Sequence, residues 1–345
     1  MIGAGAGGSR WHRICVALAA GAFGLSLAAG SASALDHIKI GVVHSLGGAS
    51  AFVAEAKGYF KEEGLDAELV FFTSAAPIAV AGASGDIDFG STGMTAAFCN
   101  LAHAGTLRII GSGSWEHPGF ETIGFLVSNQ AYAAGLHSLK ELKGHSVGIT
   151  QLGTPLHYDL ARVLKKYAIP LDSIKVLALQ SNPNVASALK GGQVDAAVQT
   201  TSNIYSLVAK GDAKVLGWVA DEFGSGQSAV TFTTGKMAKE HPDIVRRFLK
   251  AFRKGGATWD AGFTDAHGNR KDQPSAPEMI DIVAKALHEP PEVIKRGIGY
   301  FDPDDRLVLS DVQDALDWYQ EQGMLKTHID AASMIDKRFA IFVHK

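Results

Sequence analysis

The first third of the chain alternates short apolar runs with longer runs of small or amphipathic character. Residues 38–43 predict a strand, residues 51–62 a helix that Gly64 ends, and residues 66–72 a second strand. The alternation continues through residues 76–83, 87–89, 94–103 and 107–110. Strands that alternate with helices are typical of parallel sheets covered on both faces. The pattern therefore predicts an α/β fold.

The same order of elements recurs further along the chain. Gly41, Gly85 and Asp88 each have an identical residue 107 positions later, at Gly148, Gly192 and Asp195. The expected elements of the second copy are strands at 146–150, 174–179, 194–198 and 215–219 and helices at 156–167 and 184–190. Three matches at one offset could arise by chance in a chain with 39 glycines, but the element order agrees as well. Two similar α/β lobes are therefore expected.

After Gly235 the pattern changes to long amphipathic segments. Helices are expected at 236–258, 276–287, 291–296 and 310–322, and a surface loop at 264–273. We assign residues 35–123 with 226–345 to the first lobe and 124–225 to the second. The helical C-terminal region is expected to pack on the first lobe.

The N-terminus has the order of a secretory signal. Arg10 and Arg13 precede an apolar run at 14–29, and Ala32 to Ala34 supply the small residues of a cleavage site. A buried or membrane-anchored helix is the alternative, but these 16 apolar residues are fewer than the roughly 20 that a span needs. We expect residues 1–34 to be a signal peptide cleaved after Ala34, and the mature protein to be periplasmic.

Charge and cysteine content exclude several classes of function. Lysine and arginine number 32 against 35 aspartates and glutamates, a net charge of −3, which argues against a nucleic-acid partner. Cys15 and Cys99 are too few for a disulfide framework and form no C-x-x-C pair, and none of the 13 histidines has metal-ligand spacing. We expect neither a metal nor a cofactor.

Two motifs could carry catalysis. Residues 144–148 match G-x-S-x-G, but a nucleophile elbow needs a strand before its serine and a helix after it. Here Ser146 is expected to begin a strand instead. Trp115, Glu116 and His117 could form a catalytic or metal-binding group, although a lone His–Glu pair in a loop is more often structural. The motifs favour binding over catalysis.

The informative residues are spread over the loops that follow the expected strands. Ligands of parallel α/β sheets bind beyond the carboxyl ends of the strands. The loops at that edge are 44–50, 73–77, 91–94, 113–120, 150–157, 180–184 and 199–202. They are rich in Ser, Thr, Gln, Gly and His, contain no Lys or Arg, and lead toward helices whose N–H groups would face a ligand. Helix capping alone explains a Ser or Thr before a helix without any ligand.

Three segments carry a family resemblance. Residues 54–70 (AEAKGYFKEEGLDAELV), 83–90 (ASGDIDFG) and 139–144 (LKELKG) resemble the nitrate/sulfonate/taurine family of periplasmic substrate-binding proteins of ABC transporters. The resemblance implies a type II, Venus-flytrap fold, in which two α/β lobes joined by two crossing strands hold a ligand between them. Related pyrimidine-synthesising enzymes carry a cysteine-rich motif that this chain lacks, which argues against an enzyme.

The resemblance and the loops together give a candidate site. The family's ligand contacts match His44, Ser45, Leu46, Ser74, Ala75, Ser91, Thr92 and residues 151–154, here Gln151, Gly153 and Thr154. The residues themselves add Trp115 and His157 as packing partners and Gln199 and Thr200 as polar contacts. The charged head of the ligand is expected at the N-terminus of the helix that begins near Pro155, because Gly153 allows close approach and Thr154 adds a hydroxyl.

The sequence thus predicts a monomeric periplasmic solute-binding protein of an ABC importer that delivers its ligand to an inner-membrane permease. The expected ligand is a small organic anion, a sulfonate or a carboxylate that could be aromatic. A neutral heterocycle such as a pyrimidine remains open, since the same Gln, Ser and Thr groups could contact its edges. A hydrolase or transferase that uses the same cleft also remains open, and would differ in consuming its ligand.

Overall fold

A computed structural model describes residues 34–343, which form one compact unit. The expected signal peptide lies outside the described residues, apart from Ala34. Among the described residues, no helix combines the length and the apolar character that crossing a membrane requires.

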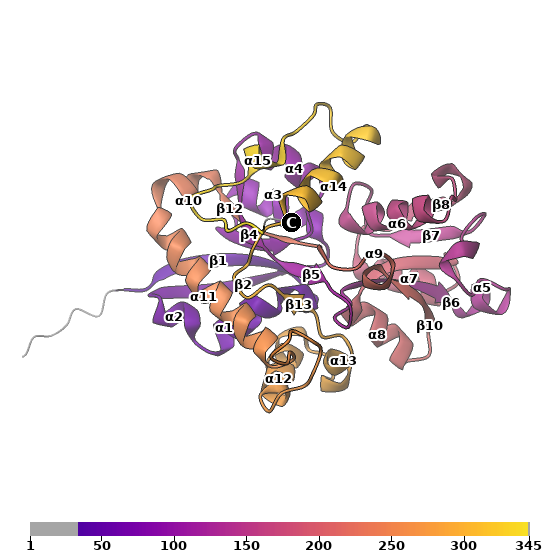
Figure 1. Ribbon diagram of the computed structural model, residues 1–345, viewed down its shortest axis with the longest axis horizontal. Helices are drawn as coiled ribbons and strands as arrows, with labels where there is room; N and C mark the ends of the chain where they lie inside the picture. The colour runs from indigo at the N-terminus through magenta and orange to yellow at the C-terminus, as the bar shows by residue number, and fades with distance from the viewer. Residues whose placement is uncertain (1–33, 344–345) are drawn as a thin grey trace, which may run out of the picture. The chain divides into compact units, whose positions relative to one another are not determined.

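Two five-stranded sheets form the framework (Figure 1). The first has the order β2 (Leu65–Phe72), β1 (Asp36–Val43), β3 (Phe89–Thr92), β12 (Val230–Thr234) and β4 (Leu107–Ser112). The second has the order β8 (Lys175–Ala178), β7 (Ser146–Ile149), β9 (Ala196–Thr200), β6 (Ile123–Ser128) and β10 (Ala213–Trp218). Position by position the two orders correspond, so the repeat inferred from the sequence has a counterpart in the topology. The α/β class is confirmed, whereas the lobe boundaries stay a prediction.

The expectation of parallel sheets is wrong for one strand of each sheet. β12 runs antiparallel to β3 and β4, and β6 runs antiparallel to β9 and β10. Each is the first strand of its sheet that the chain forms after leaving the other large sheet, so it enters from the opposite end. Two strands joined by a covering helix run parallel, because the helix returns the chain to the same end of the sheet. A strand that the chain reaches from the other sheet has no such helix before it, so it can run antiparallel to its neighbours.

The two crossing connections pair with each other. β5 (Ser114–Glu116) lies between β11 (Gly226–Gln227) and β13 (Tyr300–Phe301) in a small antiparallel sheet. β5 belongs to the outgoing crossing and β11 to the returning one, so the residues around them lie between the two large sheets.

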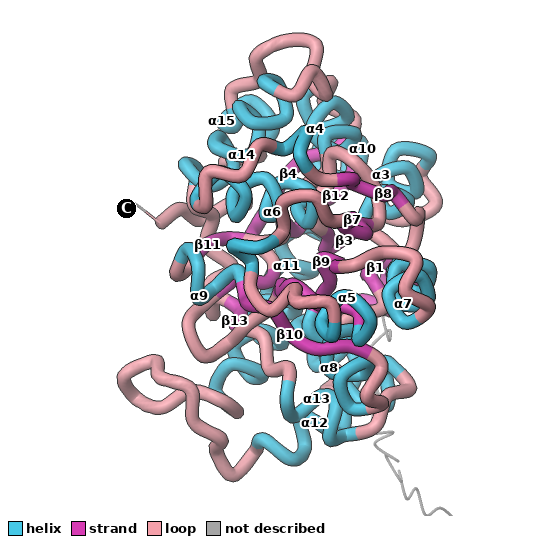
Figure 2. The backbone as a smooth tube through the Cα atoms, turned by 90° about the vertical axis from the view of Figure 1, so that its right-hand side faces the viewer, coloured by secondary structure: helices cyan, strands magenta, loops and turns pink. Residues whose placement is uncertain are grey.

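Helices cover both faces of the second sheet (Figure 2). α6 (Pro155–Lys166) packs with one face, where Val147 and Val198 are buried, and α7 (Asn182–Lys190) and α8 (Thr201–Ala209) pack with the other. Two shorter helices, α5 (Asn129–Ala133) and α9 (Val219–Phe223), follow β6 and β10. Adjacent residues of a buried strand therefore pack into the cores on opposite faces of the sheet, which explains why its residues are apolar in succession.

The first sheet is covered by helices from both ends of the chain. The N-terminal helices are α1 (Ala49–Ala56), α2 (Tyr59–Glu62), α3 (Ala75–Ser84) and α4 (Ala96–His103), and the C-terminal ones are α10 (Gly235–Glu240), α11 (Pro242–Ala261), α12 (Ala276–Leu287), α13 (Pro291–Arg296), α14 (Leu309–Glu321) and α15 (Ala331–Met334). Figure 1 shows α11 crossing this sheet beside α1, with Phe248 stacked on Phe89 at 3.9 Å between ring centroids. α14 and α15 pack on the other face with Phe232 and Ile109. The expected packing of the C-terminal helices is confirmed.

Two of the expected helices are interrupted. Gly58, at φ +74°, separates α1 from α2, because its left-handed backbone ends one helix before the next begins. Pro242 separates α10 from α11, since proline has no N–H to continue the first helix but suits the start of the second. The expected surface loop at 264–273 contains no helix or strand beyond one isolated bridge.

Candidate functional site

A cavity of about 90 Å³ lies at the carboxyl ends of the parallel strands of both sheets. The residues that line it are Val43, Ser45, Leu46, Gly47, Ser74, Ala75, Ser91, Thr92, Gly93, Ser114, Thr122, Ile123, Thr150, Thr154, Pro155, Leu156, Asn182, Thr200, Thr201, Ser228 and Ala229. Eight of these residues are Ser or Thr at the ends of strands or shortly after them, and three more are hydroxyl residues of the crossings. Within the described part of the chain, no charged side chain lines this cavity.

Four helices begin at the cavity wall. Ser74 precedes α3, Thr154 precedes α6, Asn182 is the first residue of α7, and Thr200 precedes α8. The first N–H groups of a helix lack intrahelical partners and carry the positive end of its dipole. The wall therefore presents positive potential from backbone groups, although its side chains are neutral.

Three buried polar atoms of the lining have no hydrogen-bond partner among the described residues. They are Ser74 Oγ, Ser91 Oγ and Asn182 Oδ1, on side chains that are 6% exposed or less. A buried polar group without a partner costs about 1–3 kcal/mol, so native proteins rarely keep several in one place. Their convergence on one cavity indicates that a bound molecule completes them.

Loops of the two sheets contact each other directly around the cavity. The N–H of Ala96, at the start of α4, donates to Gly153 O at 2.8 Å, and the N–H of Asn182 donates to Thr73 O at 3.2 Å. At the crossing, Thr201 Oγ1 donates to Thr122 O at 2.7 Å. Hydrogen bonds to main-chain carbonyls, two from backbone N–H groups and one from a threonine hydroxyl, thus hold the two halves of the site together.

Eight of the fourteen residues proposed from the sequence line this cavity. They are Ser45, Leu46, Ser74, Ala75, Ser91, Thr92, Thr154 and Thr200. The Thr154 hydroxyl also caps α6: it accepts from the N–H of His157 at 3.4 Å and donates to Gln151 O at 2.9 Å. Its proton is therefore engaged within the loop, which leaves the backbone at the start of α6 as the donor there.

The other six lie outside the lining and have partners within the protein. His44 packs edge-on against Phe71, and the Trp115 indole donates to Ser112 Oγ at 3.2 Å. Gln151 Nε2 donates to Gln180 Oε1 and Gln199 Nε2 to Asn182 O, both at 3.3 Å. Gly153 O accepts from the Ala96 N–H, and its own N–H donates to His157 Nδ1 at 3.3 Å. Burial lowers the pKa of His157 to about 4, so this ring is neutral at physiological pH. As ligand contacts these six stay predictions.

Several lining residues were not singled out from the sequence. Thr150, Asn182 and Thr201 lie within loops that the sequence placed at this edge, and the helix starts beside them were the available signal. Ser114 also lies in an expected loop, 113–120, and with Thr122 and Ser228 it comes from the crossings. Their position depends on how β5 and β11 pair, which the hydrophobic pattern does not encode.

This architecture is that of the periplasmic binding proteins. The alkanesulfonate-binding protein SsuA from Xanthomonas axonopodis pv. citri bound to MOPS matches with a TM-score of 0.71 at 19% identity, over 88% of this chain and 99% of that chain. The predicted two-lobed binding-protein fold is confirmed. The chain belongs to the NMT1/THI5 like family, whose profile matches residues 48–259.

Two related sequences extend the similarity over more of the chain. A Bacillus subtilis (strain 168) protein proposed to bind aliphatic sulfonates is 25% identical and covers 92% of this chain and 90% of its own length. The taurine-binding periplasmic protein of Escherichia coli (strain K12) is 24% identical over 62% of this chain and 64% of its own length. The resemblance found in the sequence is therefore confirmed at the level of the family.

A further solved structure with a similar fold was determined with a sulfinic acid. A mutant of DszB in complex with biphenyl-2-sulfinic acid matches with a TM-score of 0.61 at 13% identity. In this chain, burial raises the pKa of the Cys99 thiol, which lies in the core and not at the cavity. A reactive thiolate at this position is disfavoured.

Proposed function

We propose that the protein is the periplasmic solute-binding component of an ABC importer and that its ligand is a small organic anion, a sulfonate or a carboxylate. The carrying observation is a cavity without charged side chains, among the described residues, at which four helices begin and three buried polar atoms lack partners. The relatives named for sulfonate and taurine binding support a solute-binding role.

The physical case for an anion rests on many modest donors. Each N–H or O–H bond contributes about 0.5–1.5 kcal/mol, and each helix terminus about 0.3–1 kcal/mol, more when partly buried. Six to eight such groups reach the approximately 8 kcal/mol of a micromolar complex. Because these donors are fixed before binding, little of that free energy is lost to ordering side chains.

The lining of the cavity favours a ligand with a short apolar part. The cavity, of about 90 Å³, is partly open to solvent. A sulfonate or carboxylate head with two or three carbons fits this space, and the apolar side chains of Val43, Leu46 and Ile123 suit a short alkyl chain.

A neutral heterocycle is the second candidate, and one observation favours it. Asn182 Oδ1 is an acceptor without a partner among the described residues, which a ring N–H would satisfy. The Asn182 amide also carries an NH₂ group, so a rotated side chain serves an anion equally well.

Titration calorimetry on protein freed of copurifying ligand tests both candidates. Ethanesulfonate and propionate should bind at micromolar concentration with one site, benzenesulfonate should bind less tightly, and uracil should not bind. Binding of uracil alone would refute the anion proposal. Consumption of any bound compound, followed by mass spectrometry over hours, would favour the enzyme alternative over our proposal that the ligand is bound without turnover.

The remaining parts of the proposal concern the setting of the protein. We propose export with cleavage after Ala34, a monomeric state and delivery of the ligand to a permease. Intact mass of the periplasmic fraction should match a chain beginning at Leu35, and light scattering should give the mass of one chain. A retained N-terminus would refute the export proposal without touching the ligand proposal.

A further inference from the structure

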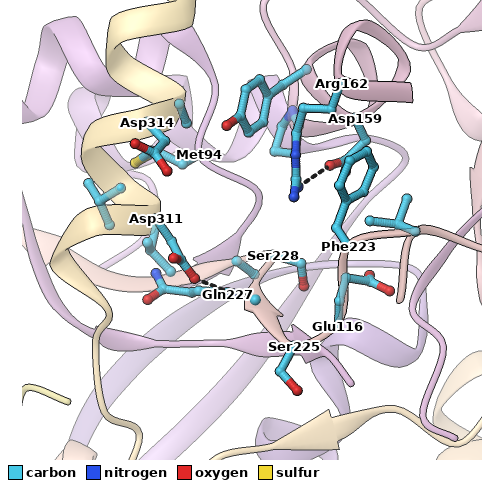
Figure 3. Close-up of a pocket in the computed structure, with 18 of the residues that line it drawn as sticks. Met94, Glu116, Asp159, Arg162, Phe223, Ser225, Gln227, Ser228, Asp311 and Asp314 are labelled. Atoms are coloured by element: carbon cyan, nitrogen blue, oxygen red, sulfur yellow. Dashed lines mark hydrogen bonds and ion pairs between the residues drawn. The ribbon is translucent and has the colours of Figure 1, made fainter. Parts of the chain in front are cut away.

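A second cavity, of about 220 Å³, lies between α6 and α14, with residues 223–230 of the returning crossing along its floor (Figure 3). Its ionisable lining residues, apart from tyrosines, are Glu116, Asp159, Arg162, Asp311 and Asp314. It shares Pro155, Ser228 and Ala229 with the first cavity, the one proposed to bind the anion, so these residues form the boundary between the two cavities. The two cavities have opposite chemistry: among the described residues, one has no charged side chain and the other is acidic.

Glu116 is the least satisfied of these groups. Its side chain is 4% exposed, its Oε2 accepts from the Thr122 N–H at 3.2 Å, and its Oε1 has no partner among the described residues. Burial raises the pKa of Glu116 well above its ordinary value, and the nearby Asp159 carboxyl raises it further. A cationic group in this cavity would favour the carboxylate form of Glu116 and so oppose both effects.

The cation that the described residues contribute to this lining is already engaged. Arg162 Nη1 donates to Asp159 Oδ1 at 3.1 Å, and its guanidinium lies over the Phe223 ring at 3.9 Å from the centroid. Asp311 accepts from the Gln227 N–H at 3.0 Å. Figure 3 shows Asp311 and Asp314 on one helix and Asp159 and Arg162 on the helix opposite, so carboxyl groups face the cavity from two walls.

We propose that this cavity is a second binding site, for a compact organic cation such as a primary ammonium group. An ammonium group has three donors and no acceptor, which suits a site where the buried Glu116 Oε1 lacks a donor among the described residues. Tyr319 is a further aromatic residue of the lining, whereas the Phe223 and Tyr158 rings already have the Arg162 guanidinium over them. The site goes beyond the proposed function, since an anion is repelled by this lining.

Calorimetry with ethylammonium and 1,4-butanediammonium chloride, at constant ionic strength against sodium chloride, tests the proposal. We expect saturable binding to one site and release of up to one proton, because a bound cation lowers the pKa of Glu116. Titrations in two buffers of different ionisation enthalpy measure that release. Glu116→Gln should weaken binding about tenfold and abolish the proton release.

Asp317→Asn is the matched control. Asp317 lies on α14 one turn from Asp314, accepts from Gln313 Nε2 at 2.8 Å and does not line the cavity. The variant removes one carboxylate from α14, the helix that also carries Asp311 and Asp314, but outside the cavity. A site effect therefore leaves its affinity within about twofold of the wild type, whereas a bulk charge effect weakens ammonium binding in Asp317→Asn as it does in the lining variants. Asp159→Asn provides a second lining variant if Glu116→Gln fails to fold.

Three results would overturn the proposal: no saturable binding of either ammonium compound, equal competition by sodium, or affinity unchanged in both lining variants. A fourth result would also overturn it: 3-aminopropanesulfonate binds more tightly than propanesulfonate, but free ammonium compounds do not bind. The acidic cavity would then hold the amino end of a ligand whose sulfonate lies in the first cavity, and it would not be a separate site. Binding of ethanesulfonate is measured on the same samples, so failure here is distinguishable from failure of the proposed function.

Discussion

The carboxylate of Asp195 accepts a hydrogen bond from the backbone N–H of Ser146 at 2.8 Å, and Asp88 accepts from the N–H of Lys39 at the same 2.8 Å. Asp88 lies just before β3 and holds a residue within β1, and Asp195 lies just before β9 and holds the first residue of β7; in both halves the two bonded residues are 49 positions apart. The repeated aspartate is thus a structural fastener in both halves. The Ser146 hydroxyl also donates to Asp195, which accounts for this serine without a nucleophile elbow.

Asp195→Ala should destabilise the protein by about 1–3 kcal/mol, because it leaves the Ser146 N–H without its acceptor. Burial opposes ionisation of Asp195, but the hydrogen bonds from Ser146 and the nearby His145 outweigh burial and lower its pKa. Urea unfolding measures the change. Asp281→Ala, on an exposed turn of α12, is the control and should cost under about 0.5 kcal/mol. Equal losses in the two variants would contradict the fastener role.

Ser91→Ala should separate binding from stability. The Ser91 hydroxyl is buried at the cavity without a partner among the described residues, so its removal should leave the ligand-free protein equally stable or more stable by up to about 1 kcal/mol. The same change should weaken ethanesulfonate binding by about three- to tenfold, since a donor to the anion is lost. Thermal unfolding and calorimetry give the two quantities.

Ser84→Ala is the control for that experiment. Its hydroxyl lies at the far end of α3 and bonds to Val80 O and Asp86, away from the cavity. Ligand affinity should not change in this variant. A loss of ligand-free stability in Ser91→Ala with unchanged affinity would mean that Ser91 is a structural residue.

The sequence predicted the elements and the edge of the sheets that carries the site, and particular residues show why. Ser74 and Thr154 were proposed from the family resemblance and Thr200 from its loop, and all three are hydroxyl residues before a helix at the carboxyl end of a strand. Gly153 before α6, His157 on α6 and Gln199 on β9 are buried and bond to Ala96, Gly153 and Asn182. Which residues at this edge face the cavity depends on such tertiary partners, and the sequence pattern does not contain them.

The antiparallel strands and the acidic cavity could not be predicted for a different reason. β6 and β12 have the same apolar pattern as their parallel neighbours, since both are buried on two faces. Only the crossing of the chain between sheets sets their direction. Glu116 and Asp314 are about two hundred residues apart in the chain and share a cavity because α14 returns to α6, so no local motif joins them.

Gly153→Ala should lower both stability and ligand affinity. Gly153 has φ +69°, and an added Cβ would lie 3.1 Å from Ala96 Cβ and 3.2 Å from Met324 Sδ. The backbone alone costs about 1–2 kcal/mol in the left-handed region, and the two contacts would displace the loop that starts α6. We expect a loss of about 2–3 kcal/mol in urea unfolding and at least fivefold weaker binding of ethanesulfonate.

Gly144→Ala isolates the backbone contribution. Gly144 has φ +81°, but an added Cβ would meet no atom within 4 Å. This variant should lose only about 1–2 kcal/mol and bind ethanesulfonate as the wild type does. If both variants kept full affinity, the start of α6 would not contribute to anion binding, contrary to our proposal.

Asp159 should make the stability of the protein depend on pH in a defined window. Burial raises the pKa of its carboxyl to about 6 from an ordinary value of 3.8, although Arg162 acts in the opposite direction. The folded protein therefore binds a proton more readily than the unfolded chain between about pH 4 and pH 6. This contribution is fully present below about pH 4, is lost as the pH rises through 6, and is constant above that.

Asp159→Asn removes the ionisation. The difference in free energy of unfolding between variant and wild type should move in favour of the variant by about 2–2.5 kcal/mol from pH 4 to pH 7.5, as expected for a shift of about two pKa units that begins just below pH 4. Arg162→Gln should move the midpoint of the wild-type transition to higher pH, because it removes the charge that favours the carboxylate. Urea unfolding at half-unit pH steps measures both. Parallel pH profiles for wild type and Asp159→Asn would show that this carboxyl does not titrate on unfolding, and would also weaken the electrostatic description of the acidic cavity.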